Sequence, residues 1–244
     1  MLYDHPALYD ALLPAGEHAA HYAALARARG GPVLELACGT GQIAVEIAAR
    51  GVPTTGLDLS AAMLKAARQR AGAAGVEIRL VEGDMRRFEL GERFGLVIIA
   101  RNSLLHCLTT DDLLSVFGEV RRHLAPGGVF AFDVFNPDVR ILSTPPTERV
   151  HVMTVPTDEL GAVTVEATSD YDAASQVNRA TWYISTPGHP DRWVAPLHLR
   201  SIFPRELPLL LERGGFRLVH RHGDLAGAPF ASASPRQVCL CASV

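Results

Sequence analysis

A glycine-containing segment near the start of the chain could bind an electron-rich ligand. Glu35 lies in a short apolar run, and Gly39 and Gly41 follow it before a stretch with helical spacing. Glycines at such a turn let a ligand approach the backbone, because no Cβ stands in the way, and free N–H groups at the start of the helix can hold the ligand. Residues 39–44 also fit the pattern G-x-G-x-x-A of dinucleotide-binding proteins. This pattern by itself leaves an NAD-dependent oxidoreductase open.

Acidic residues near three strands suit the parts of an adenosyl ligand. Asp58 ends the second strand, where a carboxylate can accept hydrogen bonds from both hydroxyls of a ribose. Asp84 and Met85 follow the third strand, where the carboxylate could accept from the exocyclic amine of adenine while the methionine packs on the ring. Glu35 is unusual for a dinucleotide-binding strand, which is normally apolar, and suits an amino-acid ammonium. Each acid also has a structural explanation, such as a buried carboxylate that accepts from backbone N–H groups.

Two further groups of residues could act on a substrate. His106 lies in the segment after the fourth strand, and its pKa range suits a general base at neutral pH. A loop histidine that hydrogen-bonds the backbone is an equal alternative. Tyr3, Tyr9 and Tyr22 lie in or beside two N-terminal helices, where aromatic rings could attract a cationic centre or simply pack the helices onto the sheet. We expect at least one of Tyr3 and Tyr9 to form part of a lid.

Arg200 and Ser103 are further candidates for contacts with a substrate. Arg200 could bind a carboxylate or phosphate, but an ion pair with Asp170 or Asp172 on a neighbouring strand is the favoured interpretation. Ser103 could orient a substrate or make a turn. The four cysteines have neither zinc nor disulfide spacing, so no metal is expected, and they fit small buried side chains in a reducing cytosol.

Hydrophobic periodicity predicts the elements that must position these residues. Strands alternate with helices, which is typical of a doubly wound parallel sheet that binds its ligand at the carboxyl ends of the strands. Ser60 is the expected N-cap of the helix after Asp58. The expected strands are 33–37, 53–58, 76–81, 94–100, 129–135, 216–220 and 237–241. The expected helices are 4–13, 16–29, 43–49, 61–70, 111–123 and 204–213, with Pro204 near the first turn of the last one.

Residues 146–203 have a different texture and indicate an insertion after the fifth strand. Alternating and β-branched patterns predict antiparallel strands at 149–155, 162–171, 176–186 and 193–203. We expect this region to cover the site and help select the substrate, or to form a homodimer contact with Trp182 and Trp193 as anchors. The chain is thus expected to be a single α/β domain over 1–244, with residues 1–30 as a helical lid.

The composition is ordinary for one globular domain, with 48% hydrophobic and 20% charged residues among 244. The formal net charge is -3 and no basic stripe is present, which argues against a nucleic-acid partner. No run approaches the roughly 18 apolar residues that span a membrane, and the first residues lack the pattern of a signal peptide. We therefore expect a cytoplasmic protein without a membrane partner.

Several longer segments together resemble the class I S-adenosylmethionine-dependent methyltransferases that act on small molecules. The segments are ELACGTG at 35–41, GLDLSAAML at 56–64, GDMRRFEL at 83–90, HLAPGGVFAFDVFNP at 123–137 and RSIFPRELPLLLERGGF at 200–216. They occur in the family's order and spacing, and the resemblance is strongest to sugar-amine N-methyltransferases and to the glycine/sarcosine type. It implies a Rossmann-like sheet of seven strands whose last strand is antiparallel. It also implies in-line transfer of a methyl group from S-adenosylmethionine to a nitrogen or oxygen of a small molecule.

The resemblance assigns parts of the cofactor to matching positions. Gly39 and Gly41 would line its methionine part, Ala37 would offer a carbonyl, and Glu35 would orient the ammonium. Asp58 would bind the ribose, with Leu59 and Met63 beside the adenosine, and Asp84 and Met85 would bind the adenine. Arg101 and Asn102 follow the fourth strand, where members of the family contact the cofactor and the substrate pocket begins. Met63 fits plain core equally well. A catalytically silent cofactor-binding module is also compatible with these residues.

Overall fold

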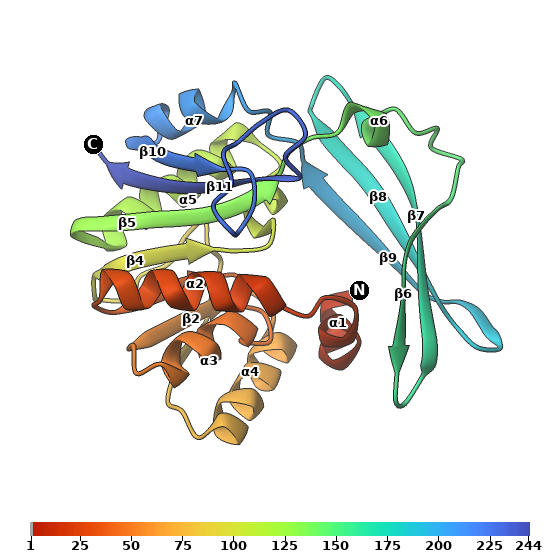
Figure 1. The fold of residues 1–244 in the computed structure, drawn as a ribbon, viewed down its shortest axis with the longest axis horizontal. Helices are drawn as coiled ribbons and strands as arrows, with labels where there is room; N and C mark the ends of the chain where they lie inside the picture. Colours follow the sequence, from red (N-terminus) through yellow and green to blue (C-terminus); the bar gives the residue numbers. More distant parts are fainter. Residues whose placement is uncertain (1) are drawn as a thin grey trace.

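Two β-sheets organise the structure, a computed structural model that describes residues 2–244 (Figure 1). The larger sheet has seven strands in the order β10-β11-β5-β4-β1-β2-β3. Its strands are β1 (Val33–Leu36), β2 (Thr54–Asp58), β3 (Arg79–Glu82), β4 (Phe94–Ile99), β5 (Leu124–Phe135), β10 (Phe216–His222) and β11 (Arg236–Ser243). Strands β1 to β5 pair in parallel, whereas β11 runs antiparallel to both β5 and β10. This confirms the expected seven-stranded sheet with an antiparallel last strand.

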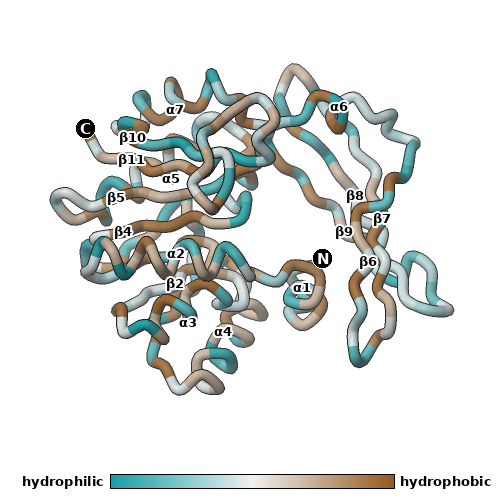
Figure 2. The backbone as a smooth tube through the Cα atoms, in the orientation of Figure 1, coloured by the Kyte–Doolittle hydropathy of each residue, from teal (hydrophilic) through white to brown (hydrophobic). Residues whose placement is uncertain are grey.

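Helices cover both faces of the larger sheet. On one face, α2 (Gly16–Arg29) and α3 (Gln42–Ala49) share a buried cluster with β4 and β5. On the other face, α5 (Thr110–His123) and α7 (Leu207–Arg213) share a second cluster with the same strands. The helix α4 (Ala61–Ala74) begins at the expected N-cap, because the Ser60 hydroxyl accepts from the Met63 N–H at 3.3 Å. Figure 2 shows the strongest hydrophobic character along β4, in the middle of the sheet.

The start of α7 differs from the sequence prediction. The helix begins at Leu207 rather than near Pro204, and Pro208 is the proline in its first turn. Residues 204–206 form a turn instead, in which the Glu206 N–H donates to the Phe203 carbonyl at 3.0 Å. The Glu206 carboxylate accepts a hydrogen bond from Arg200, the last residue of the preceding strand, at 2.6 Å.

The smaller sheet is antiparallel and is inserted between β5 and α7. Its strands are β6 (Val150–Thr157), β7 (Gly161–Asp172), β8 (Val177–Thr186) and β9 (His189–Arg200), paired in sequence order. A short helix, α6 (Val139–Leu142), precedes it. The four strands agree with the prediction, except that the last one begins four residues earlier and ends at Arg200 instead of Phe203. Figure 1 shows this sheet standing to one side of the larger one.

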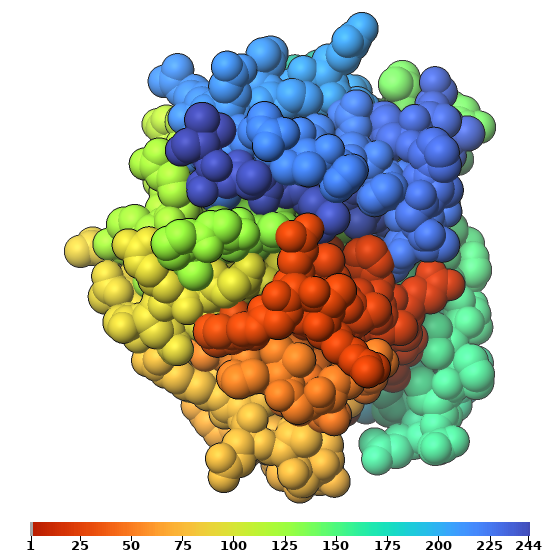
Figure 3. Space-filling view, turned by 60° about the vertical axis from the view of Figure 1, so that its left-hand side comes forward, coloured from red at the N-terminus to blue at the C-terminus, as the bar shows by residue number. Residues whose placement is uncertain are grey.

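The N-terminal segment joins the two sheets. A short 3₁₀ helix (Leu2–Asp4) is followed by α1 (Pro6–Leu12), so the predicted helix 4–13 is divided where Pro6 starts α1. Apolar side chains of this segment form one buried cluster with strands of the smaller sheet: Leu2, Leu8, Leu12, Val163, Val165, Ile184 and Ala195. Figure 3 shows the segment lying across the surface between the larger sheet's helices and the smaller sheet.

Over residues 2–244, no helix is both long enough and apolar enough to cross a membrane.

Candidate cofactor site

A small cavity lies at the carboxyl ends of β1 and β4, beneath α1. Its volume is 20 Å³, room for little more than a water molecule. Its lining combines a lid tyrosine, the buried acid of β1, the glycine loop and the segment after β4: Tyr9, Glu35, Ala37, Cys38, Thr40, Gln42, Ile43, Ala100, Arg101 and Ser103. The structure therefore brings together five of the site candidates from the sequence, Tyr9, Glu35, Ala37, Arg101 and Ser103.

Glu35 on β1 is the most unusual residue at this edge of the sheet. Its side chain is 2% exposed, and Oε2 has no hydrogen-bond partner among the described residues. Burial raises the pKa of the carboxyl to about 8, although a backbone bond from Ala44 and the charge of Arg101 act in the opposite direction. Because an unpaired buried carboxylate oxygen is unfavourable, this geometry marks a place where a cation or a donor would bind.

The glycine loop adopts a shape that needs its glycines. Gly39 and Gly41 have φ angles of 55° and 74°, in the left-handed region. A Cβ on Gly41 would stand 3.0 Å from the Ala67 Cβ of α4, whereas a Cβ on Gly39 would meet nothing within 4 Å. The open side of Gly39 leaves room for a ligand against the backbone, and the close contact at Gly41 lets α4 approach the loop.

Asp58 links the end of β2 to this loop. Its Oδ2 accepts from the Gly39 N–H at 2.7 Å, and its Oδ1 accepts from the Ser60 N–H at 2.8 Å. Burial raises the pKa of the carboxyl, and these backbone bonds oppose that effect. Each oxygen keeps a further lone pair, so the carboxylate can still accept from ribose hydroxyls.

Arg101 and Asn102 form a strained turn after β4. Both have left-handed φ angles, 57° and 67°. The Arg101 N–H donates to Asp133 Oδ1 at 2.9 Å, and the Phe135 N–H donates to the Asn102 side-chain oxygen at 2.7 Å. These bonds to β5 hold the turn against its backbone strain and fix where Ser103 and the next residues lie.

Asp133 is a supporting residue that the sequence reasoning missed. It is fully buried, and besides Arg101 it binds Tyr22, His18 and Arg236 at 2.8, 3.2 and 2.6 Å. The available signal was a single acid in the middle of the apolar run 129–135. A buried acid in such a strand must find donors elsewhere in the fold.

Tyr22 is not part of a lid, contrary to expectation. It has no exposed surface and donates its hydroxyl to Asp133, so it packs α2 onto the sheet. The ring lies on the face of α2 that meets the larger sheet, and this excludes a position over a ligand.

Tyr3 and Tyr9 do lie over the site. The Tyr3 hydroxyl is 3.0 Å from His106 Nε2, and the rings of Tyr3 and Tyr9 are 6.0 Å apart. The Arg101 guanidinium lies over the Tyr9 ring at 5.5 Å and donates to the Leu13 carbonyl at 2.6 Å. Displacement of water lowers the pKa of His106 below its usual value, so the ring is neutral at pH 7.

The adenine candidates occupy different environments. The Asp84 carboxylate is held by the Arg86 guanidinium at 2.6 Å, and Arg86 also binds Asp112 at 3.0 Å. This ion pair lowers the pKa of Asp84.

The two adenosine candidates differ in exposure. Leu59 is 69% exposed, whereas Met63 is 1% exposed within the core. The structure therefore places Met63 among plain core residues rather than on a ligand-facing surface.

Arg200 pairs differently from the expectation. Its guanidinium binds Glu206 at 2.6 Å and Thr110 at 3.1 Å, so the predicted pairing with Asp170 or Asp172 is wrong. The register places Arg200 opposite Val177 at the end of β9, where the chain turns toward α7. The side chain is 6% exposed and connects β9 to the helices beside it.

The two tryptophans of the smaller sheet face the N-terminal segment. Trp182 and Trp193 pack against the apolar cluster that includes Leu8 and Leu12, and the Trp193 ring is 5.9 Å from the His5 ring. These contacts leave both side chains partly buried.

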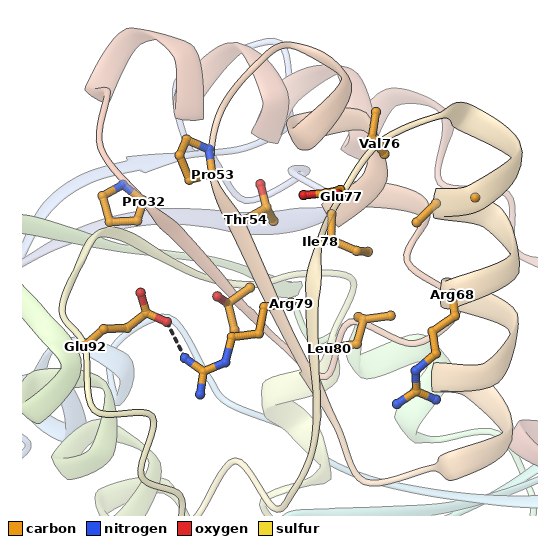
Figure 4. A pocket seen from close by; sticks show the side chains of 13 residues that line it. Pro32, Pro53, Thr54, Arg68, Val76, Glu77, Ile78, Arg79, Leu80 and Glu92 are labelled. Atoms are coloured by element: carbon orange, nitrogen blue, oxygen red, sulfur yellow. Dashed lines mark hydrogen bonds and ion pairs between the residues drawn. The ribbon is translucent and has the colours of Figure 1, made fainter.

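A larger hollow of 610 Å³ lies at the opposite edge of the sheet (Figure 4). It is lined where the strands begin, by residues such as Pro32, Thr54 and Arg79, and Figure 4 shows Arg79 paired with Glu92, at 2.6 Å. It contains none of the residues singled out above, so the chemistry belongs to the carboxyl edge.

Comparisons with known proteins find similar methyltransferases. A family model described as a methyltransferase domain matches residues 33–128. The solved CcbJ methyltransferase from Streptomyces caelestis is 28% identical, with a TM-score of 0.80 over 95% of this chain and 90% of its own. Residues 33–128 thus match a methyltransferase domain, and nearly the whole chain is similar to a solved methyltransferase. These similarities favour a methyltransferase over the oxidoreductase that the glycine pattern left open.

Curated relatives match a shorter region of the chain. The dTDP-4-amino-2,3,4,6-tetradeoxy-D-glucose N,N-dimethyltransferase of Saccharopolyspora spinosa is 35% identical over 134 residues, 52% of each chain. The putative methyltransferase YqeM of Bacillus subtilis (strain 168) is 38% identical over 105 residues, 43% of this chain and 42% of its own. The chain thus spans about half the length of the curated relatives it matches.

The candidate site fits S-adenosylmethionine, the molecule bound in a solved structure similar to this chain. The amino-acid end of that molecule carries an ammonium and a carboxylate. Glu35 offers a buried carboxylate oxygen without a partner, and Arg101 has no carboxylate within ion-pair distance among residues 2–244. One cavity thus holds a carboxyl group that can pair with an ammonium once it is ionised and a guanidinium that can pair with a carboxylate, as a zwitterion requires.

Proposed function

We propose that the chain methylates an amino nitrogen of a small molecule, such as an amino sugar. The observation that carries the proposal is the contact between His106 Nε2 and the Tyr3 hydroxyl at 3.0 Å, beside the Arg101 segment. Because the pKa of His106 is lowered, its ring is unprotonated at neutral pH and has a lone pair that can accept a proton. The relative from Saccharopolyspora spinosa, which is named as an N,N-dimethyltransferase of an amino sugar, supports nitrogen as the acceptor atom.

The chain's own residues would orient the cofactor. Glu35 would hold the ammonium and Arg101 the carboxylate. Asp58 would accept from the ribose, and Asp84, fixed by Arg86, would accept from the adenine amine. When bound, S-adenosylmethionine supplies the methyl group from a sulfonium centre. The protein then contributes alignment and exclusion of water rather than stabilisation of a leaving anion.

His106 would act as the base for the acceptor. An amine attacks only when it has lost its extra proton, so a nearby neutral base helps at pH 7. In the tautomer whose Nε2–H donates to the Tyr3 oxygen, His106 Nδ1 would carry the free lone pair that receives this proton. Burial raises the pKa of Tyr3 above its usual value, so the phenol stays neutral and keeps the ring of His106 in place.

The test is methyl transfer from isotopically labelled S-adenosylmethionine to a panel of small amines, with hydroxyl compounds of the same skeleton as matched partners. Mass spectrometry of the products would show the label on nitrogen if the proposal holds. Label found only on oxygen would contradict the choice of acceptor atom. Binding of cofactor without transfer to any compound of either kind would favour the silent module.

We also propose a cytoplasmic protein that acts on a free small molecule rather than on nucleic acid. The four cysteines are unpaired and buried, as suits a reducing compartment. The net charge of -3 gives no support for a polyanion.

A further inference from the structure

Asp10 is the point where the N-terminal helix meets the glycine loop. Its Oδ1 accepts from the Thr40 hydroxyl at 2.5 Å and from Gln42 Nε2 at 2.7 Å. Its Oδ2 binds Arg70 Nη2 at 2.5 Å. One carboxylate on α1 thus ties together the glycine loop, the first residue of α3 and the middle of α4.

These contacts fix the shape of the loop from more than one side. Arg70 Nε donates to the Thr40 carbonyl at 3.0 Å, so Asp10 and Arg70 hold the side chain and the backbone of the same residue. Gln42 Nε2 also donates to the Leu13 carbonyl at 3.2 Å, just beyond α1. Gly41 lies between the two residues that Asp10 holds. The conformation of residues 40–42 therefore depends on where α1 lies.

The same helix covers the amino-acid end of the site. Glu35 is 2% exposed and shares its cavity with Tyr9 of α1. A cofactor can reach Glu35 only when α1 moves away from the larger sheet.

The two attachments of α1 differ in kind. Toward the smaller sheet the contacts are apolar and dry, with Leu8 and Leu12 at 5% and 3% exposure. Toward the glycine loop they are polar, and the side chains of Asp10 and Arg70 keep 26% and 37% of their surface exposed. Water can replace the polar contacts, whereas the apolar ones lose free energy on exposure. The bonds of Asp10 should therefore break first.

We propose that Asp10 is a positioning residue: it acts through Thr40 and Gln42 to hold the glycine loop in its closed shape, and its release sets the rate at which cofactor enters and leaves. The inference rests on the proposed cofactor site.

The test compares Asp10→Asn with Glu46→Gln in the full chain. Asp10→Asn keeps the size of the side chain and removes the charge that Arg70 binds. Glu46→Gln removes an exposed i,i+4 pair with Arg50 on α3 and serves as the matched control. Amide hydrogen exchange of residues 2–15 and 39–42, without ligand, reports the contact itself. Release of S-adenosylhomocysteine, followed by tryptophan fluorescence, reports its effect, because Trp193 lies beside His5.

We expect faster exchange in both segments of Asp10→Asn and release of S-adenosylhomocysteine that is about three- to tenfold faster, with the control unchanged. Thr40→Val, which removes only the hydroxyl that donates to Asp10, should shift both readouts in the same direction by less. If Asp10→Asn does not fold, the exchange and release rates of Thr40→Val test the inference instead.

Two results would overturn this inference without contradicting the proposed function. One is a loosened segment 2–15 with unchanged release, and the other is an equal effect in Glu46→Gln. If the native chain binds no S-adenosylhomocysteine, the proposed function is contradicted. The claim that Asp10 sets the rate of cofactor exchange would then fail as well.

Discussion

At the scale of single residues, Glu35 makes stability depend on pH. Its folded pKa is about 8 because it is buried, which is above the ordinary value of 4.5 expected when the chain unfolds. The folded state therefore holds this proton more tightly. The resulting stability is fully present below about pH 4.5 and is lost as the pH rises through about 8. Glu35→Gln has no such proton, so its free energy of unfolding should fall less over this range, as urea denaturation would measure.

Glu35 should also control cofactor affinity. An ammonium needs the ionised carboxylate, so the native chain should bind S-adenosylhomocysteine more tightly as the pH rises toward about 8. Glu35→Gln should bind about tenfold to a hundredfold more weakly and lose this dependence, because a charge-assisted bond is replaced by a neutral one. Titration calorimetry across this range would measure both. An unchanged pH dependence in the variant would place the ammonium elsewhere.

His106 should affect turnover rather than cofactor binding. His106→Gln removes the base, so we expect kcat to fall by about a hundredfold or more while the affinity for S-adenosylhomocysteine stays within about twofold. Since the pKa of His106 is lowered, the native rate should hold from neutral pH to below the usual histidine range and decline at more acidic pH. Tyr3→Phe keeps the ring and loses the hydroxyl, and it should give a smaller loss. Steady-state rates against pH check all three statements, and a full rate in His106→Gln would refute the assignment.

At the scale of elements, the glycine loop and α4 pack without room for a side chain. In Gly41→Ala the new Cβ would lie 3.0 Å from the Ala67 Cβ, on top of a φ angle of 74°. We expect a loss of about 2–4 kcal/mol of stability, from overpacking plus backbone strain. Gly51→Ala is the matched control, because its φ is 77° but its Cβ would meet nothing within 4 Å. Its loss should be about 1–2 kcal/mol, from strain alone.

Urea denaturation of the two variants separates packing from strain. Equal losses at Gly41 and Gly51 would mean that α4 shifts freely and that its close contact with the loop is unimportant.

At the scale of the whole molecule, α1 stabilises the attachment of the smaller sheet. Leu12 is 3% exposed in the cluster that joins α1 to that sheet. Leu12→Ala should lower the free energy of unfolding by about 2–4 kcal/mol, because it removes buried apolar surface and leaves a cavity. Leu209→Ala, at a position 68% exposed on α7, should change it by less than about 0.5 kcal/mol.

Denaturation curves would measure these changes, and binding of a hydrophobic dye would report exposure of the smaller sheet. A Leu12 variant as stable as the Leu209 variant would show that the apolar cluster contributes little.

The sequence by itself determined the elements and most of the candidate cofactor residues. Strand-loop-helix order, Ser60 as an N-cap, the glycines of the loop and the acids at strand ends are local signals, because periodicity and turn chemistry act over a few residues. The carboxyl ends of parallel strands meet at one edge, so residues such as Glu35 and Asp58 come together once the sheet forms. The family resemblance added the antiparallel last strand, which no local pattern shows.

Only the tertiary structure decided which distant side chains meet. Tyr22 and Asp133 are 111 residues apart, and Tyr3 and His106 are 103 apart, so no local pattern records these contacts. The partner of Arg200 depended on the register of β9 and on the turn before α7, which a one-residue change would alter. The contacts of Asp10 likewise arise from how α1 packs between two sheets. Such contacts depend on topology and burial, and these are properties of the whole fold.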